Sequence, residues 1–153
     1  MEFFQTKLYH QYQPNFYDNV PSWEDVINNI DHSIQVHAEM RGLKFFGMVC
    51  KDASMIKQKD YIENLIITHN PDRLLTKTQL YLSMSSKSQG FGKHNDTTDV
   101  WFWQFIGQTT WTVYDTEEVI YTLSPGDMIY VPKGMYHDVK PLSPRAGLSF
   151  GIK

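Results

Sequence analysis

Cysteine is almost absent from this chain, which contains only Cys50 among its 153 residues. An internal disulfide is therefore impossible, which fits a reducing compartment. Positive charge is also limited: 14 Lys and Arg residues stand against 17 Asp and Glu residues, and no basic run is present. The electrostatic footprint of a nucleic-acid-binding protein is missing. No apolar stretch reaches the roughly 18 residues that a membrane-spanning helix needs.

The first residues, Met1 to Gln5, lack the basic region and the apolar stretch of a signal peptide. We therefore expect a soluble, cytoplasmic protein with no membrane partner and no nucleic-acid partner. Hydrophobic content of 41% and charged content of 20% are typical of a globular chain rather than a disordered one. The length fits one domain over residues 1–153, because chains of this size bury a sizeable core.

Residues 1–77 have mixed α/β character. A helix is expected to begin at Ser22, with Asp25 three residues on as a relative of the capping box, and a second helix is expected over residues 60–69. Residues 44–49 read as a short strand. From residue 78 onward the pattern turns to strands, expected at residues 79–83, 99–106, 109–114, 119–123, 128–131 and 147–152. Six or more short strands favour a mainly β fold with a closed or sandwiched antiparallel sheet.

Three residues point to a metal site. His94 and Asp96 form a His-x-Asp pair just before an aromatic strand, and His137 follows about 40 residues later. Two histidines and one carboxylate are the ligands of the facial Fe(II) site, which leaves the opposite coordination positions open for a co-substrate and dioxygen. The pattern therefore predicts that His94, Asp96 and His137 bind a metal ion and form the catalytic centre.

The run from Gly126 to His137 has the form G-x5-P-x-G-x2-H, which resembles the second signature motif of the cupin superfamily. The upstream stretch resembles the first cupin motif in part, with His94 in the first histidine place and Gly107 in the closing glycine place. Asp96 stands where many cupins have a second histidine, and Val100 stands where they have a glutamate ligand. The four-ligand cupin site is therefore not expected here, and the residues present leave a site with three ligands, one of them a carboxylate.

That variant resembles the Jumonji-C and ribosomal-oxygenase-like branch of the cupins. The matching run covers residues 78–152, and it includes His94-x-Asp96, Gln104 to Gly107 before Trp111, Leu123 to Asp127, Tyr130 to Pro132, His137 and Leu148 to Phe150. The resemblance implies a double-stranded β-helix (jelly roll) over residues 78–153. It also implies an Fe(II) cofactor, 2-oxoglutarate as co-substrate, and hydroxylation of a C–H bond in a primary substrate.

One departure from this branch concerns the co-substrate. The lysine that pairs with the distal carboxylate of 2-oxoglutarate in the branch is replaced here by Thr109, which can donate a hydrogen bond but carries no charge. Arg145, eight residues after His137, is the first candidate for a substitute, because an arginine can bind a carboxylate through two parallel hydrogen bonds. Lys93 is the second candidate. Gln104 and Tyr81 are further candidates for contacts with the co-substrate.

Several questions stay open at this point. Trp101, Trp103, Phe105 and Trp111 are candidates for the wall of the site, although strand alternation sends some of them to the opposite face. The leading hypothesis is a dioxygenase acting on a protein side chain or a small molecule. The alternatives are a metal-binding cupin that does not use 2-oxoglutarate, such as another dioxygenase or an isomerase, and a non-catalytic cupin used for binding. Pairing into a homodimer is a further expectation from the cupin resemblance.

Overall fold

The computed structural model describes residues 10–12, 20–33, 36–39 and 47–153. Two helices and ten strands follow one another along these described residues. In chain order they are β1 (His10–Tyr12), α1 (Trp23–His32), β2 (Val36–Glu39), β3 (Gly47–Cys50), α2 (Lys59–His69), β4 (Leu75–Ser83), β5 (Asp99–Ile106), β6 (Thr109–Tyr114), β7 (Glu118–Leu123), β8 (Met128–Val131), β9 (Tyr136–Pro141) and β10 (Arg145–Ile152).

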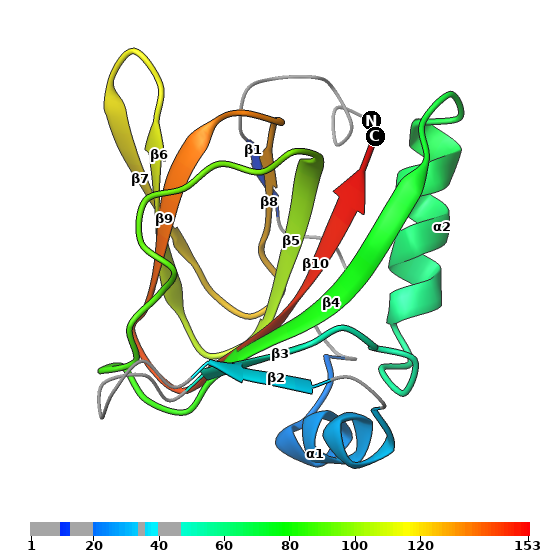
Figure 1. Cartoon of the computed structure of the whole chain (residues 1–153). Helices are drawn as coiled ribbons and strands as arrows, with labels where there is room; N and C mark the ends of the chain where they lie inside the picture. The colour runs from blue at the N-terminus through cyan, green and yellow to red at the C-terminus, as the bar shows by residue number, and fades with distance from the viewer. Residues whose placement is uncertain (1–9, 13–19, 34–35, 40–46) are drawn as a thin grey trace.

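The strands form two antiparallel sheets. The larger sheet has the order β1-β8-β5-β10-β4-β3-β2, and the smaller sheet has the order β7-β6-β9. The two sheets face each other, with β6, β7 and β9 on one side and β4, β5 and β10 on the other (Figure 1). Chain neighbours such as β8 and β9 lie in different sheets, as a double-stranded β-helix requires. The predicted fold class is confirmed.

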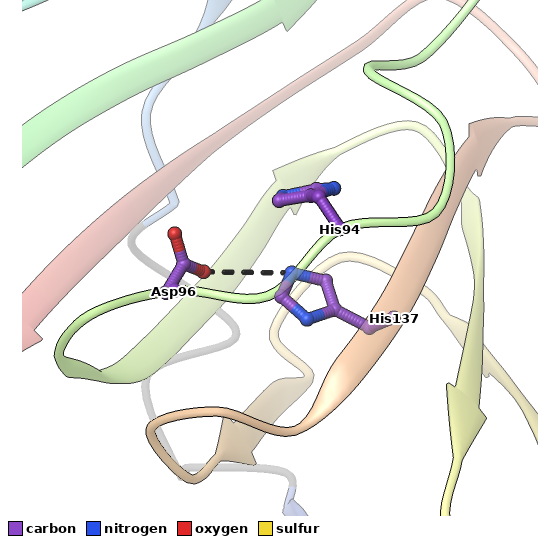
Figure 2. A group of neighbouring side chains, drawn as sticks. All are labelled: His94, Asp96 and His137. Atoms are coloured by element: carbon purple, nitrogen blue, oxygen red, sulfur yellow. Dashed lines mark ion pairs between the residues drawn. The ribbon is translucent and has the colours of Figure 1, made fainter.

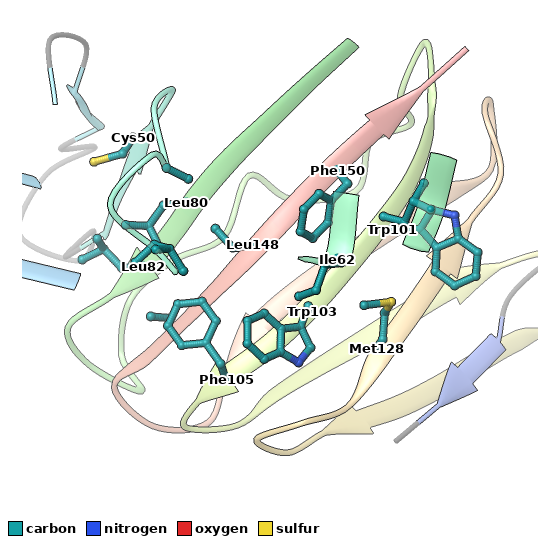
Figure 3. Packing of buried hydrophobic residues seen from close by; sticks show 14 of the residues in the cluster. Cys50, Ile62, Leu80, Leu82, Trp101, Trp103, Phe105, Met128, Leu148 and Phe150 are labelled. Atoms are coloured by element: carbon teal, nitrogen blue, oxygen red, sulfur yellow. The ribbon is translucent and has the colours of Figure 1, made fainter. Parts of the chain in front are cut away.

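Strand β5 separates two hydrophobic clusters. Trp101, Trp103 and Phe105 pack on one face of the larger sheet together with Ile62 of α2 and Leu148 of β10 (Figure 3). The alternate residues of β5 point between the two sheets, where Val100 and Phe102 pack against Trp111. Strand alternation explains this division, because successive side chains point to opposite faces. Of the four candidates for the wall of the site, Trp111 faces the space between the sheets, and Trp101, Trp103 and Phe105 lie on the opposite face, as strand alternation allows.

The two helices cover the outer face of the larger sheet. Helix α1 begins with the complete capping box between Ser22 and Asp25, and it buries Val26. Helix α2 buries Ile62 and Ile66 against the sheet and ends at His69, just before Asn70 and Pro71. Both helices confirm the sequence-based predictions to within one residue at their starts. None of the described residues forms a helix with the length and apolar character that crossing a bilayer would require.

Several strands differ from the sequence-based predictions: β1 and β2 were not expected, and β4 and β10 begin four and two residues earlier than expected. Strand β9 was not expected, because its residues include two charges, a histidine and a proline and give no apolar alternation. It forms because β6 supplies a full ladder of backbone partners, from Thr109 paired with Pro141 to Tyr114 paired with Tyr136. The strand predicted at residues 44–49 lies partly outside the described residues, and β3 begins at Gly47.

Gly147 on the inner face of β10 allows close packing between β10 and β5. At Gly147, an added Cβ would lie 2.5 Å from Cζ of Phe102 and 2.7 Å from the carbonyl oxygen of Trp103. The backbone of β10 therefore approaches the inward ring of β5 more closely than any side chain at residue 147 would permit. This close approach leaves Phe102 in place as part of the inner wall.

We expect Gly147→Ala to lower the free energy of unfolding by about 1–3 kcal/mol, the range typical of overpacking a buried position. The clash involves a backbone oxygen and a buried ring, and neither can move freely. Urea denaturation followed by tryptophan fluorescence measures the change. Ser149→Ala, two residues along the same face, is the control and should change stability less. Equal stability of Gly147→Ala and the wild type would contradict the close packing.

Candidate metal centre

The three predicted ligands come from two segments that the fold brings together. His94 and Asp96 lie in the connection between β4 and β5, and His137 lies in β9. The backbones of His94 and His137 form an antiparallel bridge, in which the N–H of each residue donates to the carbonyl oxygen of the other. The nitrogen-to-oxygen distances are 2.9 Å and 2.8 Å. The N–H of Gly134 donates to the carbonyl of Asp96 at 3.0 Å. Backbone hydrogen bonds therefore hold all three residues before any metal ion binds.

The side chains of His94, Asp96 and His137 point toward one another (Figure 2). One potential ligand atom from each residue lies within 4.8 Å of the others, and Nε2 of His137 lies 3.5 Å from Oδ2 of Asp96. Ligands at 2.0–2.2 Å from one ion stand about 3 Å apart when they are adjacent in the coordination sphere. The three atoms are therefore already grouped near that spacing. The donor set of two imidazoles and one carboxylate fits a divalent transition metal.

Backbone carbonyls orient both imidazoles. Nδ1 of His94 lies 2.8 Å from the carbonyl oxygen of Gly92, and Nδ1 of His137 lies 3.1 Å from that of Met135. A carbonyl oxygen only accepts, so Nδ1 carries the proton in each ring and Nε2 keeps its lone pair for a metal. This is the outer partner that metal-binding histidines usually have.

The environment of His137 favours the neutral ring that a metal needs. His137 is buried, and the ring of Trp111 stacks on it at 5.4 Å with an interplanar angle of 18°. Burial lowers the pKa of His137, and the neighbouring His94 lowers it further, against the opposing effect of the Met135 carbonyl. Because metal ions compete with protons for imidazole, a lowered pKa favours metal binding near neutral pH.

A second polar cluster fixes the turn that precedes His137. The carboxylate of Asp99 accepts hydrogen bonds from the Tyr130 hydroxyl and from the backbone N–H of Lys133, both at 2.7 Å, and it pairs with the guanidinium of Arg73. Burial alone would raise the pKa of Asp99, but the hydrogen bonds from Tyr130, Lys133 and Arg73 lower it. Burial and the hydrogen bond to Asp99 raise the pKa of Tyr130 to about 12. The next residue along the turn, Gly134, is the one that binds Asp96.

The ligand triad opens into a pocket between the two sheets. Its lining includes His94, Asp96 and His137 together with Arg145 and Tyr81. Arg145 is buried in the first position of β10, where its Nε donates to the Ser83 hydroxyl at 3.1 Å. Within the described part of the chain, Nη1 of Arg145 has no hydrogen-bond partner. Burial lowers the pKa of Arg145 to about 10, so the guanidinium stays charged at pH 7.

The other three predicted co-substrate residues lie elsewhere. Nζ of Lys93 sits over the ring of Tyr114 at 3.8 Å, outside the pocket lining. The hydroxyl of Thr109 donates to Oε1 of Gln104 at 3.1 Å, and the amide of Gln104 donates to the carbonyl oxygen of Ile106. Both residues are buried and bonded to the β5–β6 turn rather than exposed in the pocket. Their roles toward a co-substrate stay predictions, and the geometry favours Arg145 and Tyr81.

Sequence reasoning missed several lining residues. Lys77 and Ser83 of β4, Phe102 of β5 and Ser149 of β10 all line the pocket. Strand alternation supplies the signal that could have found them. Lys77 and Ser83 lie four and two residues from Tyr81 on β4, and Ser149 lies four residues after Arg145 on β10. Residues at even spacing share one face of a strand, so these side chains point into the same space as Tyr81 and Arg145.

Comparison with known proteins identifies the family. A model of the JmjC domain matches residues 49–122 and 116–153. The chain belongs to the JmjC-domain family. Its predicted membership of the Jumonji-C branch of the cupins is confirmed. No curated protein matches this JmjC protein by sequence.

Solved structures share the JmjC fold with this chain. An X-ray structure of ycfD from Escherichia coli has 16% identity and a TM-score of 0.76, over 99% of this chain and 51% of that chain. The YcfD ribosomal oxygenase from Escherichia coli in complex with cobalt and 2-oxoglutarate has 18% identity and a TM-score of 0.72, over 99% and 50%. An oxidoreductase of the 2OG-Fe(II) oxygenase family from Burkholderia pseudomallei has 11% identity and a TM-score of 0.65, over 95% and 85%.

The JmjC chain spans only part of the YcfD structures that it matches, between 34% and 51% of their length. At these identities the likeness concerns the fold. The shared region contains the two sheets and the connection that carries His94 and Asp96.

We expect Asp96→Ala and His137→Ala to weaken metal binding by more than about 100-fold, because even the loss of an outer partner of a ligand costs 10–100-fold. Titration of Co(II), followed by its visible absorbance, measures the affinity. His69→Ala, an exposed histidine of α2 far along the chain from the triad, is the control. Unchanged Co(II) affinity in either ligand variant would refute the assignment.

The Asp99 cluster predicts a pH dependence of stability. The folded-state pKa of Asp99 is lowered, so its stabilisation is present above the unfolded-state pKa of about 4 and is lost as pH falls through the folded-state pKa. We expect Asp99→Asn to lower the free energy of unfolding at pH 7 by about 2–3 kcal/mol, as expected for hydrogen bonds to a charged group. The difference in the free energy of unfolding between Asp99→Asn and the wild type should become smaller below about pH 4.

Denaturation curves between pH 3 and pH 8 measure this difference. Asp115→Asn, at the exposed turn between β6 and β7, is the control acid. A difference in the free energy of unfolding between the wild type and Asp99→Asn that stays constant from pH 3 to pH 8 would show that the Asp99 charge is not the stabilising feature.

Proposed function

We propose that this JmjC protein is an Fe(II)- and 2-oxoglutarate-dependent oxygenase that hydroxylates a C–H bond. The observation that carries the proposal is a buried cation in the same pocket as the ligand triad. Arg145 has no acidic partner among the described residues, and its guanidinium keeps a donor group unused. A buried, unpaired charge costs stability, so a site that retains one is built for an anion that binds later.

Arg145 and the triad are connected along the pocket wall by aromatic rings. The guanidinium lies 5.8 Å from the ring of Phe102, which lies 5.1 Å from the ring of Trp111, which in turn stacks on His137. Two aromatic rings therefore form a continuous wall from Arg145 to His137. A molecule with a carboxylate at one end and a chelating keto acid at the other spans such a pocket along its wall.

Each residue of the site has its own role in this proposal. His94, Asp96 and His137 would hold Fe(II) on one face, and Arg145 would bind the distal carboxylate of 2-oxoglutarate, with Ser83 fixing the guanidinium. Bound Fe(II) and 2-oxoglutarate would supply the activation of dioxygen and release succinate. Phe102 and Trp111 exclude water from the inner wall, which protects a reactive centre from side reactions. The YcfD structure that contains cobalt and 2-oxoglutarate supports this reading, because this chain shares its fold.

One observation favours the alternative, a metal-binding cupin that does not use 2-oxoglutarate. Thr109 stands in the place of the lysine that the resemblance leads one to expect, and its hydroxyl is already bonded to Gln104. Anaerobic Fe(II) titration separates the two functions. The weak visible absorbance of the Fe(II) chelate on addition of 2-oxoglutarate, followed by succinate release in air, supports the oxygenase. Fe(II) binding that is insensitive to 2-oxoglutarate supports the alternative.

We expect Arg145→Met to weaken 2-oxoglutarate binding by about 10- to 100-fold, the effect of losing charge-assisted hydrogen bonds. Fe(II) affinity should stay the same. The free energy of unfolding without ligands should stay equal or rise, because an uncompensated buried charge is removed. Lys93→Met, a cation outside the pocket, is the control. Unchanged 2-oxoglutarate affinity in Arg145→Met would eliminate Arg145 as the anchor.

A further inference from the structure

A second cation lines the pocket, and the proposed co-substrate site does not use it. Among the described lining residues, Lys77 and Arg145 carry the permanent positive charges, and Asp96 is the one acid. Lys77 has no ion pair with any described side chain. Its exposure contrasts with the full burial of Arg145, so it lies at the open part of the pocket.

The strand register places the two cations at opposite ends of the pocket. Arg145 pairs with Ser83 at one end of the β4–β10 ladder, and Gly151 pairs with Lys77 at the other. Asp99 starts β5 beside Ile152, so β5 begins at the Lys77 end. The ligand Asp96 lies three residues before that start. The candidate metal therefore lies toward the Lys77 end, and a co-substrate that joins Arg145 to the metal leaves Lys77 on the other side.

A glycine makes room for the Lys77 side chain. An added Cβ at Gly151 would lie 3.0 Å from both Cγ and Cε of Lys77, so the aliphatic stem lies directly across β10. An aliphatic stem packed on a strand with its ammonium near solvent is the usual arrangement for a lysine at the rim of a pocket. The Lys77 charge is thereby held at the entrance rather than on the outer surface.

Charge balance then favours an anion beside Lys77. A divalent metal, Lys77 and Arg145 contribute four positive charges, and Asp96 with a doubly negative co-substrate contributes three negative charges. One positive charge stays unbalanced, and a cleft lined by charge of one sign attracts ligands of the opposite sign. Phe91, exposed at the same entrance and edge-on to the rings of His94 and Tyr81, offers an apolar contact.

We propose that Lys77 binds a carboxylate of the primary substrate and so selects an anionic substrate with an apolar body. The inference rests on the proposed function, because it assigns Lys77 to the substrate that remains after the metal and 2-oxoglutarate are bound. Lys77 is a specificity-determining residue in this assignment and takes no part in metal binding.

The test uses a matched pair of probes, phenylacetate and phenylacetamide, which have the same shape and differ in charge. Each is titrated by calorimetry into the full chain loaded with Mn(II) and saturating 2-oxoglutarate, so that no turnover occurs. We expect phenylacetate to bind at least about tenfold more tightly than phenylacetamide, the effect of one charge-assisted hydrogen bond. Lys77→Met should abolish this preference, and Lys77→Arg should keep it.

Two controls make the outcome specific. Lys87→Met removes a lysine outside this pocket and should keep the preference for phenylacetate. Lys77→Met should bind 2-oxoglutarate as tightly as the wild type does, whereas Arg145→Met should not. A loss of 2-oxoglutarate affinity in Lys77→Met would assign Lys77 to the co-substrate and overturn the proposal.

Three further results would overturn it. These are equal binding of the two probes, no binding of either probe in the millimolar range, and a preference that survives in Lys77→Met. Each of them leaves the proposed function intact if the wild type still binds 2-oxoglutarate in the presence of Mn(II). Failure of the wild type to bind 2-oxoglutarate would instead refute the proposed function itself.

Discussion

The paired backbone hydrogen bonds between His94 and His137 are the interaction on which the candidate metal centre depends. His94 belongs to the connection between β4 and β5, and a connecting segment has more conformational freedom than the strands it joins. The bridge makes this segment a local extension of the smaller sheet, because His94 adds to β9 on the side opposite β6. The bond from Gly134 to Asp96 then fixes the remaining ligand. Positioning by backbone bonds leaves all three side chains available for a metal.

The pocket is lined on one side by the inner face of β10, which carries small residues and one charged side chain. Arg145, Gly147, Ser149 and Gly151 alternate along the inner face of a strand whose outer face carries Leu148 and Phe150 in the main cluster. The outer face supplies the hydrophobic stabilisation, and the inner face supplies space and a charge. This separation explains how one strand can be completely buried and still line a polar pocket.

The parts of the fold and site that follow local rules could be predicted from the sequence. The turn residues from Gly126 to Gly134 and the spacing to His137 identified the ligand triad, and apolar spacing located both helices. The parts that depend on long-range contacts could not. The Thr109 hydroxyl donates to Oε1 of Gln104, both residues lie outside the pocket lining, and only the fold shows that they meet. The same holds for Arg73, whose partner Asp99 lies on β5 after a long connection.

The order of residues along the pocket has a consequence for the proposed chemistry. Arg145 is fully buried at the inner end, the triad lies between the ends, and Lys77 and Phe91 lie at the entrance. A co-substrate that reaches Arg145 must pass the position that the primary substrate occupies beside the metal. Under the proposed function, co-substrate binding would therefore precede substrate binding, and the entrance residues would meet the substrate after the charge of Arg145 has been neutralised. In the proposed scheme Arg145 and Lys77 would act in sequence, each on a different anion.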